Sequence, residues 1–125
     1  MRLSHGDPSV RFWAATAFSI ANEQRDDIEN ELLSHTNDPS PAVRIAVAEA
    51  LYRYGNHDTA IEVLSAGLDE EHPFAKLRAL NTIEALNIEN MGDELADKIA
   101  TVRESHDEEW GTDYYIRRAA TAILE

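Results

Sequence analysis

The 125-residue chain contains no cysteine, which excludes a disulfide scaffold, a thiolate zinc site and a cysteine nucleophile. Its five glycines form no phosphate-binding loop, and a Gly-x-Ser-x-Gly nucleophile motif is missing as well. No apolar run approaches the roughly 20 residues of a membrane span. We therefore predict no catalytic residue, no cofactor and no membrane association.

Basic residues are also scarce, because 11 Lys and Arg stand against 24 Asp and Glu, giving a formal net charge of −13. The negative electrostatic field of so acidic a chain repels polyanions, so direct binding of nucleic acid is disfavoured. Hydrophobic residues make up 43% of the chain, enough to give a small domain a buried core. We expect one domain over residues 1–125.

An internal repeat organises this domain. An apolar residue followed by arginine begins at positions 10, 43, 77 and 116, so the copies are 33, 34 and 39 residues apart. Asp7-Pro8 precedes the first copy, Asp38-Pro39 the second and His72-Pro73 the third. A period of this length is typical of solenoids built from helical pairs.

Each copy opens a stretch with helical periodicity. In the first, one face carries Val10, Trp13, Ala14, Ala17, Phe18 and Ala21. The second carries Val43, Val47, Ala50, Leu51 and Tyr54, and the fourth Ile116, Ala119, Ala120, Ile123 and Leu124; in the third, Asn81 and Glu84 interrupt the stripe. Between the copies lie further amphipathic stretches, marked by Ile28 and Leu32, by Ile61, Leu64 and Leu68, and by Leu95, Ile99 and Val102.

The pattern predicts an all-α fold, a right-handed α-α superhelix with about three and a half helical pairs. A half repeat would occupy residues 1–24, followed by repeats at about 25–55, 56–89 and 90–125. Because the series begins with half a unit, we expect the chain to be an excerpt of a longer protein.

Asp7 and Ser40 are expected to cap helices that begin with Pro8 and Pro41. Gly55 should end a helix, and Thr59 with Glu62 has the spacing of a capping box.

The helical pairs, the Asp-Pro turns and the repeated apolar-Arg pair resemble HEAT repeats of the phycobilisome lyase-like kind. Segments 7–15, 38–51 and 113–119 also resemble the C-terminal helical segment of bacterial heparan N-sulfatases and arylsulfatases. That second resemblance implies a periplasmic or extracellular parent enzyme with a Cys/Ser-x-Pro-x-Arg motif. These 125 residues do not contain the motif, so no catalytic residue is carried over.

In HEAT proteins, arginines at the repeated position form a ladder with aspartates of neighbouring turns. The resemblance therefore implies a structural ladder, with a contact to an anion or glycan as the alternative. Its members would be Arg11, Arg44, Arg78 and Arg117, with Asp7, Asp38 and Asp113 as partners.

Four histidines, His5, His35, His72 and His106, fall near the predicted turns beside acidic residues. We interpret them as favourable charges at helix C-termini, with a pH-sensitive edge or a metal site as alternatives. A metal is disfavoured because equivalent side chains on packed helices lie about 8–10 Å apart, beyond the roughly 2 Å ligand distances of zinc.

Two aromatic groups are candidate interfaces. Phe12, Trp13 and Phe18 would lie at the uncovered first helix, where a second copy could cover them and form a homodimer. The second group belongs to a carboxylate-rich turn at 107–115 and consists of Trp110, Tyr114 and Tyr115. Their rings could stack on a sugar or on a cation, or they could fold back over the end of the solenoid. The turn does not match the calcium-loop pattern.

We expect a non-catalytic scaffold or interaction module, most simply the C-terminal accessory domain of a secreted or periplasmic sulfatase. Its partner would be the catalytic domain of its own parent chain or another protein. The alternative is a stand-alone acidic adaptor that recruits basic proteins.

Overall fold

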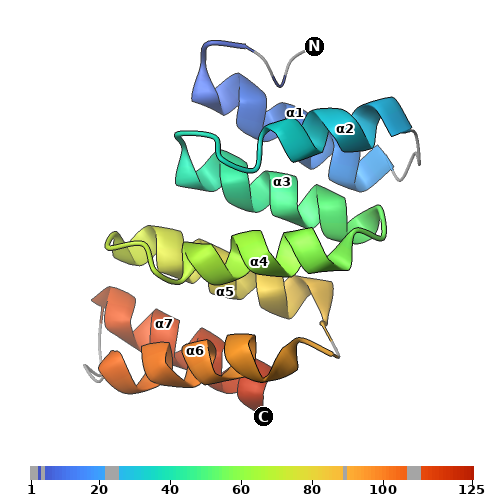
Figure 1. The fold of residues 1–125 in the computed structure, drawn as a ribbon. Coiled ribbons are helices and arrows are strands. Elements are labelled where there is room, and N and C mark those ends of the chain that lie inside the picture. The colour runs from blue at the N-terminus through green and yellow to red at the C-terminus, as the bar shows by residue number, and fades with distance from the viewer. Residues whose placement is uncertain (1–2, 4, 22–25, 89, 107–110) are drawn as a thin grey trace. The chain divides into compact units, whose positions relative to one another are not determined.

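The computed structural model describes residues 3, 5–21, 26–88, 90–106 and 111–125 (Figure 1). Seven α-helices and no strands occur within this part of the chain: α1 (Pro8–Ala21), α2 (Asp26–Ser34), α3 (Pro41–Arg53), α4 (His57–Gly67), α5 (Pro73–Leu86), α6 (Gly92–Ser105) and α7 (Gly111–Leu124). The fold class is therefore all-α and HEAT-like, as predicted. None of the helices described is both long enough and apolar enough to span a membrane.

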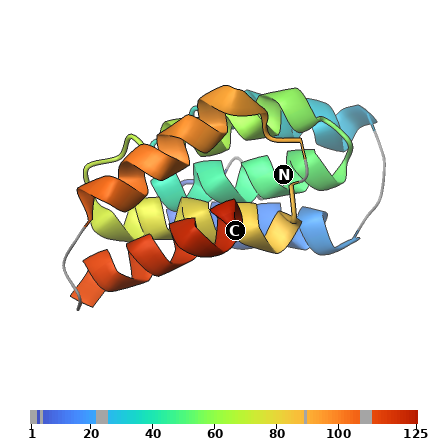
Figure 2. The same cartoon turned by 90° about the horizontal axis from the view of Figure 1, so that it is seen from below.

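The chain divides into two compact units, residues 1–63 and 64–125, and the boundary falls within α4. In the first unit α1 packs along α3, and α2 also contacts α3. In the second, α7 packs against both α5 and α6. Figure 2 shows α2 in a different layer from α1 and α3, and α6 in a different layer from α5 and α7. Each unit therefore contains the two helical layers expected of paired repeats.

The start of α3 follows the predicted chemistry. Pro41 occupies the first turn, where its missing N–H costs nothing, and the Ser40 hydroxyl accepts a hydrogen bond from the Val43 amide at 3.4 Å. The start of α4 differs from the prediction. The helix begins at His57, and the Asn56 side chain accepts from the Thr59 amide at 3.4 Å. The capping box at Thr59 and Glu62 was wrong because Thr59 already lies inside the first turn.

Gly55 ends α3 as predicted, through a Schellman motif. Its φ is +96°, a left-handed conformation that side chains resist. The Gly55 amide donates to the Tyr52 carbonyl at 3.0 Å, and the Asn56 amide donates to the Leu51 carbonyl at 2.9 Å. The residue that stops one helix is therefore followed directly by the residue that caps the next.

Most of the core matches the predicted apolar faces. Leu95, Ile99 and Val102 are buried on α6, and α3 buries residues on several sides: Val43, Ile45, Ala46, Val47, Ala48, Ala50 and Leu51. On α5 the polar residues Asn81 and Glu84 are exposed, so they do not interrupt the buried face.

The predicted stripe of α1 is the exception. Trp13 is 67% exposed and Ala17 is exposed, whereas Ala14, Ala15 and Ser19 are buried. The predicted face was therefore right for Ala14 and wrong for Trp13 and Ala17. Small side chains allow α1 to pack closely along α3, and the bulkier aromatic residue is left on the surface.

We predict that Gly55→Ala lowers the free energy of unfolding by about 1 kcal/mol, because alanine disfavours the left-handed conformation. Urea unfolding followed by circular dichroism measures the change. Gly6→Ala is the matched control, since a Cβ there meets nothing within 4 Å and its φ is not positive. Equal effects of the two substitutions would contradict this interpretation.

Candidate functional site

Asp38, in the turn before α3, is the centre of a buried polar cluster. Its side chain is 3% exposed. Arg11 of α1 donates twice to this carboxylate, from Nε to Oδ2 at 2.8 Å and from Nη2 to Oδ1 at 3.0 Å. The Ser40 amide donates to Oδ1 at 2.9 Å, and His35 Nδ1 lies 3.6 Å from Oδ2. One carboxylate thus joins α1 to the turn between α2 and α3.

The ionised form of this carboxylate is favoured despite its burial. Burial alone would raise the pKa of Asp38, but the Arg11 hydrogen bond, the Ser40 amide, the Arg11 charge and the His35 bond act in the opposite direction. Together they hold the pKa of Asp38 below its ordinary value.

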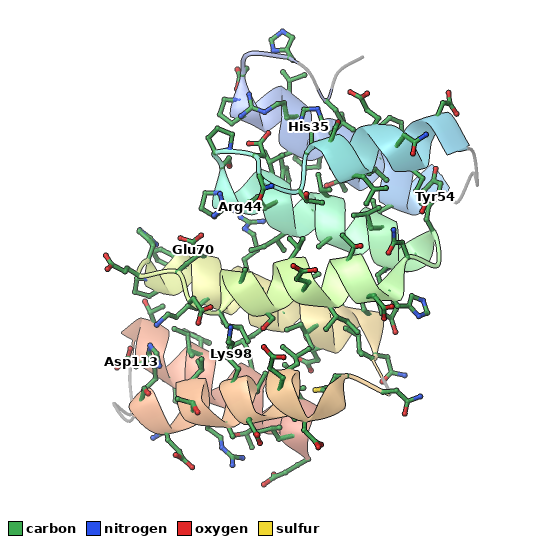
Figure 3. All side chains as sticks on the ribbon, in the orientation of Figure 1. His35, Arg44, Tyr54, Glu70, Lys98 and Asp113 are labelled. Carbon is green, nitrogen blue, oxygen red and sulfur yellow. The ribbon has the colours of Figure 1, made fainter. Side chains whose placement is uncertain are left out.

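Arg44 joins the same cluster through the backbone. Its Nη1 donates to the Asp38 carbonyl oxygen at 2.6 Å, from the first turn of α3 (Figure 3). Arg11 also donates from Nη1 to the carbonyls of His5 and Gly6, at 2.8 and 3.0 Å, and so fixes the segment before α1. Two of the four repeated arginines therefore meet around one aspartate.

The other predicted ladder residues have different positions. The Asp7 carboxylate accepts from the Ser9 amide at 2.8 Å, the helix-start role predicted for it. Arg78 is exposed on α5, whereas Arg117 and Asp113 are half-buried on α7. A ladder that includes these three residues stays a prediction.

The histidines divide into two kinds. Nδ1 of His5 accepts from the Asp7 amide at 3.0 Å, and Nδ1 of His72 accepts from the Phe74 amide at 3.2 Å. The helix-dipole interpretation is wrong for these two, since a ring nitrogen that accepts carries no proton and both lie at helix starts. The helix-dipole interpretation fits His106, which follows the last turn of α6. Its Nδ1 lies 2.8 Å from the Val102 carbonyl oxygen and must donate to it, because a carbonyl oxygen only accepts.

His35 lies beyond the end of α2 (Figure 3), between two carboxylates. Its Nε2 is 3.5 Å from Glu31 and its Nδ1 is 3.6 Å from Asp38. Among the residues with described positions, no three His, Asp or Glu side chains gather as a metal site would require.

The aromatic residues of α1 form the most exposed apolar feature of the first unit. The rings of Phe12 and Trp13 meet edge to face, with centroids 5.4 Å apart at 75°. Trp13 is largely exposed, while Phe12 and Phe18 are half-buried.

Tyr114 and Tyr115 of α7 form a second edge-to-face pair, with centroids 5.4 Å apart. Both are exposed. Trp110, the third residue of that candidate interface, lies outside the described residues.

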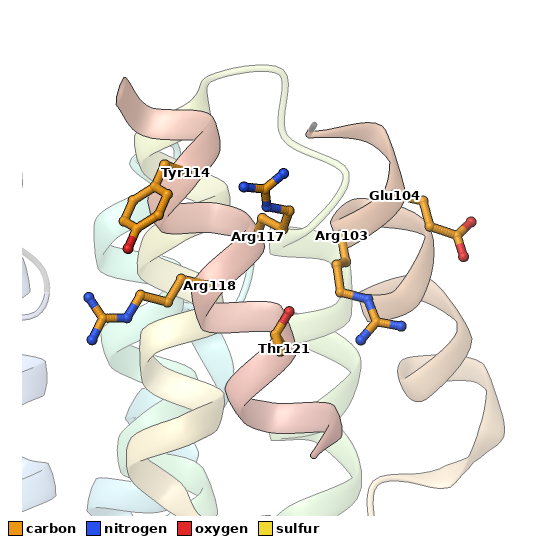
Figure 4. Close-up of a pocket in the computed structure, with 6 residues that line it drawn as sticks. All are labelled: Arg103, Glu104, Tyr114, Arg117, Arg118 and Thr121. Carbon is orange, nitrogen blue, oxygen red and sulfur yellow. The ribbon is translucent and has the colours of Figure 1, made fainter. Parts of the chain in front are cut away.

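Tyr114 also borders a pocket of about 520 Å³ on α6 and α7 (Figure 4). Its lining consists of Arg103, Glu104, Tyr114, Arg117, Arg118 and Thr121. The sequence analysis missed this pocket. A signal was present, because positions 114, 117, 118 and 121 follow helical i, i+3, i+4, i+7 spacing, but they form a polar face.

We predict that Arg44→Ala lowers the free energy of unfolding by roughly 1–3 kcal/mol, the cost of losing a charge-assisted hydrogen bond. Thermal and urea unfolding measure it. Arg53→Ala on the same helix is the control, because Arg53 is 44% exposed and pairs with Glu49 at 3.4 Å. An exposed pair of this kind contributes about 0.3–0.5 kcal/mol. An unchanged stability of Arg44→Ala would remove Arg44 from the cluster's stabilising bonds.

We predict that Asp38→Asn destabilises the fold at neutral pH and that its deficit shrinks in acid. A lowered pKa stabilises the folded state above the unfolded value of about 3.9, and this contribution is lost as pH falls through the folded pKa. Urea unfolding of both proteins from pH 7 to pH 2 tests it. Asp69→Asn is the control, since that carboxylate is 65% exposed beside Lys98. A deficit that is the same at every pH would contradict the prediction.

Comparison with protein families matches residues 2–87 to HEAT repeats. Comparisons with curated proteins and with solved structures give no significant match, so they lend the sulfatase resemblance no support. The family match covers more than half of the chain and includes the Asp38 cluster and the helices α1 to α5. The chain belongs to the HEAT-repeat family.

Proposed function

We propose that the chain is a non-catalytic protein-docking module and that its docking surface is the exposed face of α1 around Trp13. HEAT repeats are helical scaffolds that typically mediate protein–protein interactions. The observation that carries the proposal is the 67% exposed indole of Trp13 on a helix fixed by buried ionic bonds. Aromatic residues that stand on a rigid support are frequent centres of binding energy.

The support beneath Trp13 is well defined. Arg11, two residues earlier, is tied to Asp38 by two hydrogen bonds, and Ala14 and Ala15 are buried directly after it. The Phe12 ring rests edge-on against the indole, an arrangement that favours one orientation of the pair. A partner would therefore bind a surface that is already ordered, at a small entropic cost.

Charge defines the class of partner. The formal net charge of −13 attracts basic proteins and repels acidic ones, and it speeds the encounter with the former. The partner expected is a protein with an apolar pocket for the indole and basic residues at its rim. This favours recruitment of a basic protein over self-association, because a second copy carries the same charge.

Photocrosslinking tests the proposal. A photoreactive amino acid at position 13 identifies the partner in cells, and binding is then measured with the purified partner. Trp13→Ser should weaken binding about tenfold or more, as expected for a central aromatic residue. Phe74→Ser is the matched control, because Phe74 is 65% exposed on α5 and belongs to the other unit. Added salt should slow association.

Equal losses in Trp13→Ser and Phe74→Ser would contradict the assignment of the surface. Sedimentation velocity gives an independent check, since a dimer that disappears in Trp13→Ser would replace the basic partner with a second copy.

The two finer predictions, a sulfatase accessory domain and a stand-alone adaptor, differ in what the gene encodes before Met1. An upstream frame with Cys/Ser-x-Pro-x-Arg would support the former.

A further inference from the structure

His35 differs from His5 and His72 because both of its ring nitrogens face carboxylates. Nε2 lies 3.5 Å from Glu31 Oε1, one helical turn earlier, and Nδ1 lies 3.6 Å from Asp38 Oδ2. Nδ1 of His5 and of His72 accepts a backbone amide instead, a bond that protonation of that nitrogen would break. Protonation therefore acts in opposite senses at these sites.

The backbone holds His35 in this position. Its amide donates to the Leu32 carbonyl oxygen at 3.0 Å, and its own carbonyl oxygen accepts from the Asp38 amide at 3.2 Å. The His35 side chain is 18% exposed, and the Glu31 side chain beside it is 27% exposed. Charges at such partly buried positions are screened by salt less than those of a fully exposed pair.

The protonation state of the ring decides whether both contacts are favourable. A neutral imidazole carries one N–H, so one of its two nitrogens presents a lone pair to a carboxylate oxygen. An imidazolium carries a proton on each nitrogen and can donate to Glu31 and Asp38 at once. The geometry around His35 is therefore complementary to the charged ring.

Two cations bind the same aspartate and oppose this charge. Arg11 of α1 donates to Asp38 Oδ2 at 2.8 Å, and Arg44 of α3 donates to the Asp38 carbonyl oxygen at 2.6 Å. Glu31 contributes a second negative charge from α2. The four groups that flank the ring from α1, α2, α3 and the turn thus balance in formal charge, and the direct contacts of the two carboxylates decide the preference.

We propose that His35 is a protonation-dependent clamp, which ties the end of α2 to the Asp38 turn in mildly acidic solution and loosens this tie at higher pH. Both contacts are made in the folded chain, so protonation of the ring raises the free energy of unfolding, and the gain is lost as the ring is deprotonated. This pH window lies above the one in which Asp38 itself is protonated. Because Arg11 links the same carboxylate to α1, the clamp acts on the helix that carries Trp13, but it does not depend on a partner at Trp13.

A double-mutant cycle at two pH values tests the clamp. Glu31→Gln, His35→Gln and the double variant are compared with the unsubstituted chain by urea unfolding at pH 5.5 and pH 8.5. At the lower value an ordinary histidine is protonated and an ordinary glutamate is still ionised, since they titrate at about 6.5 and about 4.3. Glu31 is replaced rather than Asp38 because Asp38 also binds Arg11. The coupling between positions 31 and 35, expressed as a factor in the unfolding equilibrium constant, should be about threefold larger or more at pH 5.5.

Glu49 and Arg53 on α3 provide the matched control. This pair has the same i,i+4 spacing and a similar distance, 3.4 Å, but its cation does not titrate in this range. Its coupling, measured with Glu49→Gln and Arg53→Gln, should be the same at both pH values, and circular dichroism verifies that all variants are folded. A coupling between positions 31 and 35 that is equal at the two pH values, or larger at pH 8.5, would overturn the proposal, as would a change of the same size in the control pair.

Discussion

A buried carboxylate needs partners at defined positions, and in the first unit this need determines how α1 is placed. The Asp38 side chain is 3% exposed, and an unpaired charge at such a depth would cost several kcal/mol. Arg11 reaches it from α1, Ser40 from the start of α3 and His35 from the turn after α2. Burial of apolar side chains such as Leu32, Val43 and Leu51 supplies most of the stabilisation, as area-based arguments require. The ion pair adds specificity, because only one register of α1 along α3 places Arg11 at the carboxylate.

That register also determines which residues of α1 face outward. With Arg11 fixed and the small residues Ala14 and Ala15 buried against α3, the helical rotation leaves Trp13 on the surface. The same contact that holds the helix therefore presents its largest side chain. An exposed tryptophan on a free, rotating helix would lose much of its binding energy to ordering, whereas this one is already oriented.

Much of the fold could be predicted from the sequence because it depends on local signals. The 33- and 34-residue spacing, Pro41 after Ser40 and the Gly55 stop correspond directly to helix starts and ends. The rotation of α1 could be predicted only in part, since Trp13 was expected at an uncovered surface but helical periodicity placed it on the same face as Ala14, and only packing along α3 selects Ala14 and Ala15 for burial. The roles of His5 and His72 were also missed, because an imidazole that accepts a backbone N–H replaces the more usual Asp or Ser.

The arginine pocket shows a further limit of composition. A net charge is a sum over the chain, and it predicts the long-range field correctly while giving no information on a local reversal of sign. The reversal arises because α7 contributes Arg117 and Arg118 to the lining of the pocket, and packing of α6 against α7 adds Arg103, which precedes Arg117 by 14 positions in the sequence. The net charge therefore governs how the chain attracts or repels a distant macromolecule, whereas the residues that packing brings together decide which charge is met at contact. Composition gives the first of these, and only the packed structure gives the second.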